Sequence, residues 1–593
     1  MTERSEGMPG ARAPASRTAM GPGGAAPEKE MSDGPSPPFS SPDPALGVAV
    51  LGGPRRGGDD VVDPYDVRRS IAGAGALRAL ADATVLGAAD VRTALTLGRL
   101  AGGADDEVLV AAALAVRAVR LGHVYVDLAT AATTAVPDDD VIDLDLATLP
   151  WPDPAGWPAL VSANPLTSTG VDGPADRPLR LIGSRLYLDR YWRHERTIVA
   201  DLLRRSTATG PPVDTDVLAA GLRRLYPDAG DDEGSDDRQR LAAATAVLRR
   251  FTVVAGGPGT GKTTTVARIL ALLHEQAVAV GGPPPRVGLA APTGKAAARL
   301  AEAVHAEAVR LPVDDTVRGG LLATPASTLH RLLGWQPGNR SRFRHDAANQ
   351  LPHNVVIVDE SSMVSLSMMA KLLAAVRASA RLVLVGDPRQ LASVEAGAVL
   401  GDIVGPAAGA LQLRPAARGA LAAAVGGPVE ADDPGPDVGI GDGIIVLRRV
   451  HRFGGGIAAV ADAVEAGDPD AVVAALRRSP GDVRWLEADA PVDPSGSPLL
   501  ADVRRAVVDA AVAVVTAARR GDAAAALEAL RSVQVLCAHR RGPSGAGTWR
   551  AEIERWLRAA VAGFGVGAPA GQHDFGVGAW YAGRPLLVTE NDY

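Results

Sequence analysis

The stretch GGPGTGKT, residues 256–263, follows the apolar run FTVVA (251–255) and opens an Ala-rich helical segment. It fits the pattern G-x-x-x-x-G-K-[ST] in the strand–loop–helix context that this pattern requires. Glycines at these positions let backbone N–H groups wrap the β- and γ-phosphates of a nucleotide, assisted by the positive end of the helix. We expect Lys262 to reach the phosphates and Thr263 to ligate Mg²⁺. The predicted phosphate-binding residues are Gly256, Gly257, Pro258, Gly259, Thr260, Gly261, Lys262, Thr263 and Thr264.

Around this loop, short β-branched runs alternate with Ala-rich helical stretches. We expect strands at 251–255, 286–291, 355–359 and 381–386, and helices at 262–279, 294–308 and 364–378. This alternation predicts an α/β fold in which helices cover both faces of a parallel sheet. A Gly/Pro/Ala-rich segment, 405–440, interrupts the pattern. A second α/β pattern follows, with strands expected near 444–448, 482–487, 533–537 and 585–589.

Two other strand ends carry polar residues. VVIVDESS (355–362) ends a buried run in two carboxylates, at the sheet edge where the phosphate loop also lies. We expect Asp359 to hold Mg²⁺ and Glu360 to orient or deprotonate the attacking water. VLVGDPRQL (383–391) places Gln390 at the end of the next strand, where it would touch the γ-phosphate and report the nucleotide state to a neighbouring domain.

The amino-acid composition excludes several kinds of protein. The 593 residues are 47% hydrophobic, enough for three or four domains, and the net charge of −7 excludes a protein that binds DNA through bulk positive charge. Cys537 is the single cysteine, which excludes an internal disulfide or a cysteine zinc cluster and suits a reducing cytoplasm. The ten histidines are scattered and show no metal-ligand spacing. We find no apolar run of membrane-spanning length and no signal peptide, and expect a soluble cytoplasmic protein.

Lysine is scarce in this chain. Of 61 basic residues only four are lysines, at positions 29, 262, 295 and 371. Two of the four lie in candidate phosphate or DNA motifs. At these sites we expect a role that needs the compact ammonium of lysine and that the guanidinium of arginine cannot perform.

Several segments resemble those of superfamily 1 helicases. Gln239, in DRQRLAAA, stands where this family places a glutamine that reads the adenine edge. APTGKAAARL (291–300) and STLHRLLG (327–334) resemble its single-strand DNA segments, and RRVHRFGGGI (448–457) resembles its fourth motif. For any single arginine in these segments, the alternative to a functional contact is that it is an ordinary solvated cation on the surface. The resemblance implies a γ-phosphate contact from Arg452 in a second domain, and DNA contacts from Thr293, Lys295, Arg299, Thr328 and His330.

A narrower resemblance rests on GGPGTGKTTTVARIL, LRLIGSRLYLDRYWRHE and LCAHRRGPSGAGTWRAEIERWL. Together these are similar to the exodeoxyribonuclease V alpha subunit (RecD) family, over roughly residues 60–593. The resemblance implies an ATP- and Mg²⁺-dependent 5′–3′ DNA helicase subunit of the RecBCD complex, which acts on DNA ends in double-strand break repair and recombination. It also implies RecB and RecC as partners, contacted by the N-terminal domain. For the aromatic residues Tyr187, Tyr191 and Trp192 we favour ordinary core packing over an interface.

The expected organisation has five parts. A disordered leader (1–60) precedes a mainly helical partner-docking domain (61–230) and a RecA-like motor domain (231–405). A linker or insertion (406–440) then leads to a partial second RecA-like domain (441–593). Two further family motifs, a TVHKSQG-like and a VTRA-like sequence, occur nowhere in these residues. We therefore expect a truncated chain that binds nucleotide but does not translocate efficiently.

The sequence also bears on other functions. A nuclease of the common type needs a (D/E)-x-K triplet, and no lysine here has an acidic residue two positions before it, so nuclease activity is expected in a partner. A transporter ATPase would need an LSGGQ-like signature, and AAA+ machines lack the GDPRQL and APTGK combination. A subunit that binds ATP only for assembly remains open, and DNA-stimulated turnover would distinguish it from a motor.

Overall fold

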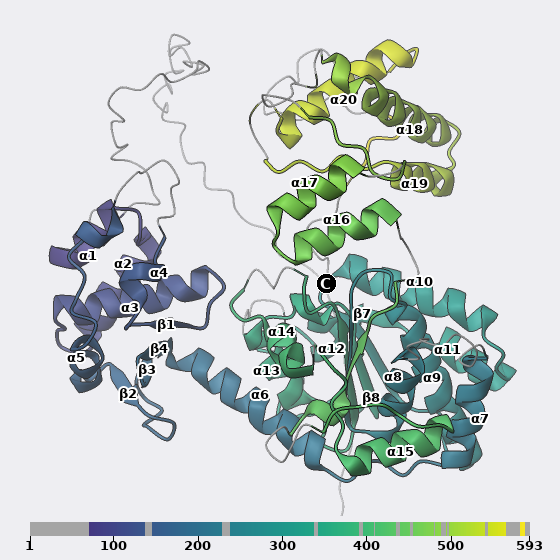
Figure 1. Cartoon of the computed structure of the whole chain (residues 1–593), viewed down its shortest axis with the longest axis horizontal. Helices are drawn as coiled ribbons and strands as arrows, with labels where there is room; N and C mark the ends of the chain where they lie inside the picture. The colour runs from purple at the N-terminus through teal and green to yellow at the C-terminus, as the bar shows by residue number, and fades with distance from the viewer. Residues whose placement is uncertain are drawn as a thin grey trace, which may run out of the picture. The chain divides into compact units, whose positions relative to one another are not determined.

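The computed structural model (Figure 1) describes residues 70, 72–136, 145–227, 238–336, 342–390, 395–407, 409–433, 439–450, 455–478, 481–487, 494, 497–539, 542, 544–564 and 581–586. All of these belong to one compact unit that spans residues 65–593. The expected leader (1–60), the acidic segment 231–237 and Arg452 lie outside the described residues. None of the described helices combines the length and the apolar character needed to span a membrane.

A six-stranded, entirely parallel sheet forms the centre of the motor region (Figure 1). Its order is β10 (Ile444–Leu447), β5 (Phe251–Gly256), β9 (Arg381–Gly386), β8 (Val355–Val358), β6 (Val287–Ala291) and β7 (Ala326–Thr328). The four strands expected between 251 and 386 are confirmed. Because the order departs from the chain order, loops that are distant in sequence meet at one edge of the sheet.

Helices cover both faces of this sheet, and side chains alternate between them along each strand. Val254 and Ile357 pack into one core and Val253 and Val356 into the other, as the two-residue period of a strand requires. The first core is covered by α7 (Thr215–Leu225), α8 (Arg238–Leu248), α9 (Lys262–Ala279), α10 (Gly294–Arg310), α11 (Asp315–Leu322) and α15 (Pro415–Val425). The second is covered by α6 (Asp189–Thr207), α12 (Leu329–Leu333), α13 (Leu366–Ala375) and α14 (Val399–Val404).

Two boundaries expected from the sequence are wrong. The segment 406–440, expected as a linker or an insertion, contributes to the first core, because α15 and its flanks place Leu413 and Leu421 there beside α7 and α8. The strand expected near 444–448 is β10, which pairs with β5 from Ile444–Val253 to Leu447–Gly256 and so belongs to the first sheet. The high content of Gly, Ala and Pro concealed a packed helix, and β10 covers the strand edge that β5 would otherwise expose.

The C-terminal part is helical where it is described. It contains α16 (Gly455–Glu465), α17 (Pro469–Arg478), α18 (Ala501–Arg519), α19 (Ala523–Ser532) and α20 (Ala546–Ala560). Among the described residues no strand follows β10, so the strands expected at 482–487 and 533–537 are absent and no second RecA-like sheet is formed there. Most of the segment 585–589 lies outside the described residues.

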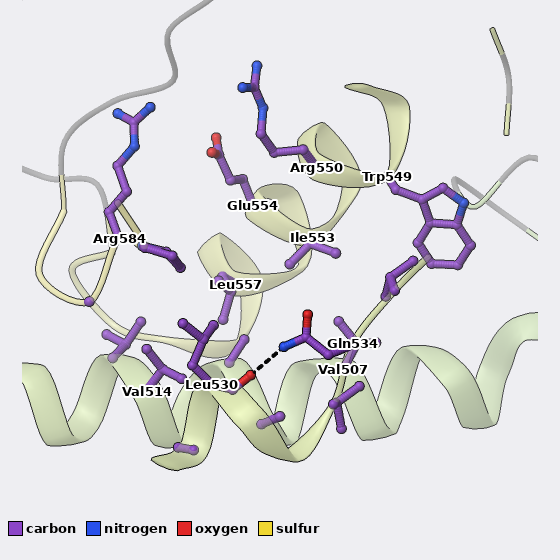
Figure 2. A pocket seen from close by; sticks show the side chains of 18 of the residues that line it. Val507, Val514, Leu530, Gln534, Trp549, Arg550, Ile553, Glu554, Leu557 and Arg584 are labelled. Atoms are coloured by element: carbon purple, nitrogen blue, oxygen red, sulfur yellow. Dashed lines mark hydrogen bonds between the residues drawn. The ribbon is translucent and has the colours of Figure 1, made fainter. Parts of the chain in front are cut away.

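Residues 533–537 nevertheless keep a strand-like pattern. Val533, Val535 and Cys537 are half-buried and alternate with the exposed Gln534 and Leu536. The half-buried side chains line an apolar cavity of about 450 Å³ between α18, α19 and α20, shown in Figure 2. The expected strand is nevertheless absent, because a strand must pair with a neighbouring strand and none is described here.

The N-terminal region joins helices to a small sheet that the sequence did not reveal. The helices are α1 (Gly75–Asp82), α2 (Ala88–Leu100), α3 (Asp106–Arg120), α4 (Ala131–Thr134) and α5 (Trp157–Ala163). The sheet order is β1 (Tyr125–Asp127), β4 (Arg185–Leu188), β3 (Leu179–Ile182) and β2 (Thr167–Thr169). Tyr187 and Tyr191 are only 5% and 8% exposed, which confirms core packing for them, and Trp192 lies half-buried with its ring 5.3 Å from that of Tyr187.

A buried arginine fixes α6 to the loop between α13 and β9. The Arg205 guanidinium donates to Asp201 Oδ2 at 2.5 Å, Val376 O at 2.7 Å and Arg377 O at 3.0 Å, and its side chain is fully buried. We predict that Arg205→Ala lowers the free energy of unfolding by roughly 3–5 kcal/mol, because it leaves several buried carbonyls without a donor and removes the buried cation that pairs with Asp201. Arg204→Ala removes the exposed partner of the same Asp201 and should cost less than about 1 kcal/mol. Urea unfolding compares the two, and equal losses would contradict the assignment.

Candidate active site

The loops that follow β5, β8 and β9 meet at the carboxyl edge of the sheet, because these three strands are neighbours. They enclose a cleft of about 490 Å³. Its lining consists of Pro258, Gly259, Gly261, Lys262, Thr263, Thr264, Asp359, Glu360, Asp387 and Gln390. The structure thus brings together three motifs that are spread over more than 100 residues of sequence.

The loop after β5 needs its glycines. Gly259 and Gly261 have φ values of +76° and +82°, the left-handed region that side chains with a Cβ disfavour. A Cβ at Gly261 would also lie 2.3 Å from Gln239 Nε2. Helix α9 begins immediately afterwards at Lys262, so its amino end faces the cleft and favours an anion there.

Lys262 lies against the carbonyl groups of its own loop. Its Nζ donates to Gly256 O at 2.7 Å and Gly257 O at 2.9 Å. Burial lowers the pKa of this ammonium, and the nearby carboxylates of Asp387, Asp359 and Glu360 oppose that shift. The cation is held in place by weak carbonyl partners that phosphate oxygens can replace.

Asp359 and Glu360 differ in their surroundings. Asp359 is 8% exposed, its Oδ1 accepts from Glu360 N at 2.9 Å, and burial raises its pKa to about 6. Glu360 is half-buried at the rim and has a φ of +52°, one of two non-glycine residues with positive φ in the described chain. Strained backbone of this kind persists where the surroundings enforce it, commonly at functional sites.

The loop after β9 supplies Gln390 and a further carboxylate. Asp387 Oδ1 accepts from Arg389 N at 3.0 Å, and Gln390 N donates to Asp387 O at 3.2 Å, which closes a tight turn. Ser362 Oγ donates to Gln390 Oε1 at 3.0 Å. Neither Asp387 nor Ser362 was assigned from the sequence. Asp387 directly follows β9, the strand beside the one that leads into the phosphate loop. That position in the sequence could have identified it as a site residue.

Gln239 and the two threonines predicted to contact DNA all form hydrogen bonds to the backbone. Gln239 Nε2 donates to Thr260 O at 3.0 Å, so this side chain packs on the loop. Thr293 and Thr328 each cap a helix that follows a strand, accepting from Ala296 N and Arg331 N, both at 3.2 Å.

The remaining predicted DNA contacts differ in exposure. Lys295 and Arg299 are exposed on α10 and have no ion-pair partner among the described residues. The His330 ring is half-buried, 5.7 Å from the ring of Phe343, and burial together with Lys371 lowers its pKa. Arg452, the expected contact from a second domain, cannot be compared because it lies outside the described residues.

A metal held by protein groups alone is not indicated. The described residues contain no group of three or more His, Cys, Asp or Glu side chains arranged to hold a metal ion. Magnesium in nucleotide sites usually takes most of its ligands from phosphates and water and only one or two from protein oxygens. Thr263 and Asp359, which line the same cleft, fit that smaller contribution.

Comparisons with known proteins agree with this geometry. The family described as AAA domain matches residues 239–396, and the family described as RecBCD enzyme subunit RecD, N-terminal domain, matches residues 82–187. The RecBCD enzyme subunit RecD of Mycobacterium tuberculosis is 45% identical over 532 residues, which cover 89% of this chain and 78% of that protein. The chain belongs to the RecD family. It is accordingly a helicase-family ATPase.

Two other matches differ in sequence identity and in the share of this chain that they cover. RecD of Mycolicibacterium smegmatis is 45% identical over 86% of this chain and 78% of that protein. The crystal structure of Pif1 helicase from Candida albicans is 18% identical over 46% of this chain and 54% of that chain, with a TM-score of 0.25. The second similarity is too weak to support an argument about function. The RecD family model covers much of the N-terminal region, and the AAA model covers every strand of the motor sheet except β10.

The raised pKa of Asp359 predicts a pH-dependent stability for the nucleotide-free protein. Because the folded pKa is about 6 and the ordinary value 3.8, the stability that the protonated carboxyl provides is lost as the pH rises from about 4 through 6. The shift corresponds to roughly 3 kcal/mol above pH 6. Asp359→Asn should therefore stabilise the nucleotide-free protein at pH 8, and the gain should shrink towards pH 4. Unfolding curves at several pH values measure this; a gain independent of pH would contradict it.

Proposed function

We propose that this RecD-family chain is the ATP-driven motor subunit of a RecBCD-type complex and moves 5′ to 3′ along single-stranded DNA. The observation that supports this proposal most strongly is the single cleft that joins Lys262, Asp359, Glu360 and Gln390. A cation, two carboxylates and an amide around an anion-binding helix end are the groups that phosphoryl transfer to water requires.

Nucleotide binding begins at the loop. The amino end of α9 and the loop N–H groups receive the phosphates, and Lys262 leaves its two carbonyl partners for the β- and γ-phosphate oxygens. Gln239, whose Nε2 donates to Thr260 O, is proposed to read the adenine edge. Thr263 and Asp359 would hold Mg²⁺, which when bound would neutralise part of the phosphate charge.

Hydrolysis then depends on Glu360, in the loop after β8, and Gln390, in the loop after β9. Glu360 lies at the rim of the cleft, where its carboxylate orients the attacking water and accepts its proton. Gln390 donates to the γ-phosphate and loses that contact when the phosphate leaves. The same change in contact signals the nucleotide state to the second part of the chain, where Arg452 is proposed to complete the site.

Single-stranded DNA is proposed to lie along the ends of β6 and β7, beside this cleft. Thr293, Lys295 and Arg299 of the first segment and Thr328 and His330 of the second contact the phosphate backbone or bases. The exposed cations on α10 suit a polyanion even though the whole chain is acidic.

Removing these cations should weaken DNA binding with a characteristic salt dependence. We predict that Lys295→Ala and Arg299→Ala each lower the affinity for single-stranded DNA and reduce the slope of log K against log[salt] by about 1. Fluorescence anisotropy with a labelled oligonucleotide at several salt concentrations measures both effects. Arg310→Ala, at the far end of α10, serves as the control. If neither variant changed the slope of log K against log[salt], the DNA would not contact these two residues of α10.

Partners and direction extend the proposal beyond the cleft. The match of residues 82–187 to the RecD N-terminal domain supports docking of this region on RecB and RecC subunits. Polarity is tested with partial duplexes that carry either a 5′ or a 3′ single-stranded tail, unwound by the chain together with RecB and RecC proteins whose own motor is inactivated. Unwinding from the 5′ tail supports the proposal, and unwinding from the 3′ tail alone contradicts the direction. A complex that hydrolyses no ATP on either substrate would favour the alternative, a subunit that binds ATP without translocating.

A further inference from the structure

Ser362 forms a bond between two loops of the cleft that the sequence separates by 28 residues. It lies in the turn after Glu360, is 6% exposed, and its Oγ donates to Gln390 Oε1 at 3.0 Å. Gln390 is itself exposed. Its backbone is held by Asp387 O, but Ser362 is the one described partner of its side-chain amide. A hydroxyl can donate to an amide oxygen or accept from an NH₂ group; here Ser362 donates to Oε1, and this bond defines the orientation of the amide in the structure.

The orientation matters because a phosphate oxygen only accepts hydrogen bonds. A glutamine amide can present either its oxygen or its NH₂ group, and the NH₂ group alone can bind a γ-phosphate. When Ser362 holds Oε1, the two N–H donors of Gln390 remain available on the other side of the amide. Without the hydroxyl, both orientations are accessible to an exposed side chain, and the one that presents its oxygen repels the phosphate.

We propose that Ser362 is a positioning residue that fixes the side-chain amide of Gln390 with its NH₂ group available to the γ-phosphate. Since Ser362 and Glu360 belong to one short loop, this bond also makes the water-activating and phosphate-sensing groups move together. The inference rests on the proposed function, because it assigns the γ-phosphate contact to Gln390. It adds to that function the residue by which ATP is distinguished from ADP.

Neighbouring Ser361 provides a matched control. It is fully buried, but its Oγ donates to Val358 O at 2.7 Å, within its own strand end, and does not contact Gln390. Ser361→Ala and Ser362→Ala therefore remove the same hydroxyl group from adjacent buried sites, and only the second releases the amide. Ser362→Thr keeps the hydroxyl and tests for rescue.

The experiment measures two quantities for the full chain and these variants: DNA-stimulated turnover, and the ratio of the dissociation constants for ATPγS and ADP. For Ser362→Ala we expect kcat to fall about tenfold, with KM for ATP changed less than about twofold, and the preference for ATPγS over ADP to fall about tenfold. Ser361→Ala should preserve both quantities, Ser362→Thr should restore them, and Ser362→Ala should add no loss to Gln390→Ala.

Each outcome decides the inference. Equal behaviour of the two alanine variants, or losses from Ser362→Ala and Gln390→Ala that multiply in the double variant, would overturn it. If the parent chain shows no DNA-stimulated turnover but Ser362→Ala alone abolishes the preference for ATPγS, the proposed motor function fails and the inference stands. A parent chain with no preference for ATPγS overturns the inference whatever its turnover.

Discussion

Lys262→Ala is expected to reduce ATP hydrolysis at least about a hundredfold, the scale found when one preorganised charge or donor is removed from a developing anion. The structure gives the reason. Lys262 is the one lysine in the lining of the cleft, its half-buried ammonium interacts with three carboxylates, and its present partners are two loop carbonyls that phosphate oxygens can replace. Steady-state phosphate release in the presence of single-stranded DNA measures the loss.

Two variants make the Lys262 result specific. Lys262→Arg keeps the charge but replaces a compact ammonium by a planar fork that does not fit the same loop, so it should remain nearly inactive. Lys371→Ala removes another of the four lysines, one that lies over the Phe343 ring at 5.2 Å, and should hydrolyse ATP normally. Substantial activity in Lys262→Ala would mean that the cleft is not the hydrolytic site.

Glu360→Gln is expected to lower hydrolysis by about 10²–10⁴-fold while ATP binding is retained, because a general base contributes in this range. The substitution preserves size and hydrogen bonding at the rim and removes only the ability to accept the proton. The buried Asp359, next to it in sequence and also in the cleft lining, is unchanged in this variant. Single-turnover hydrolysis and the affinity for ATPγS, measured on the same preparation, separate chemistry from binding.

The control for this variant is Glu302→Gln, a carboxylate on the outer surface of α10 away from the cleft lining, which should behave as the parent chain. If Glu360→Gln lost ATP binding together with hydrolysis, Glu360 would be acting on the cation. The proposal that Glu360 is the general base and Asp359 the cation ligand would then be wrong.

The motor site was predictable because its motifs are local. The loop at 256–263 needs glycine where φ is positive, a lysine at the helix start and an apolar strand before it, and all three requirements lie within about a dozen residues. The carboxyl ends of β8 and β9 were likewise visible, since a buried β-branched run that ends in polar residues marks the sheet edge. These local signals placed Lys262, Asp359, Glu360 and Gln390 in one cleft.

What the sequence did not reveal depends on contacts between distant segments. β10 pairs with β5, although the two strands lie far apart in the chain, and no local feature distinguishes β10 from the first strand of a new domain. α15 is so rich in alanine, and its flanks in glycine and proline, that the sequence shows no clear pattern of large apolar residues to mark a buried helix. Ser362 acquires its proposed role only because two loops meet in space, and a serine in a turn carries no signal of its own.

The most direct test of the motor proposal is ATP hydrolysis by the full chain, measured with and without single-stranded DNA. A motor whose nucleotide cleft communicates with DNA contacts on Thr293, Lys295 and Arg299 should hydrolyse ATP at least about tenfold faster when DNA is bound, and Lys262→Ala should abolish the stimulated rate. ATP binding without any stimulation by DNA would contradict the motor proposal and leave a nucleotide-binding subunit.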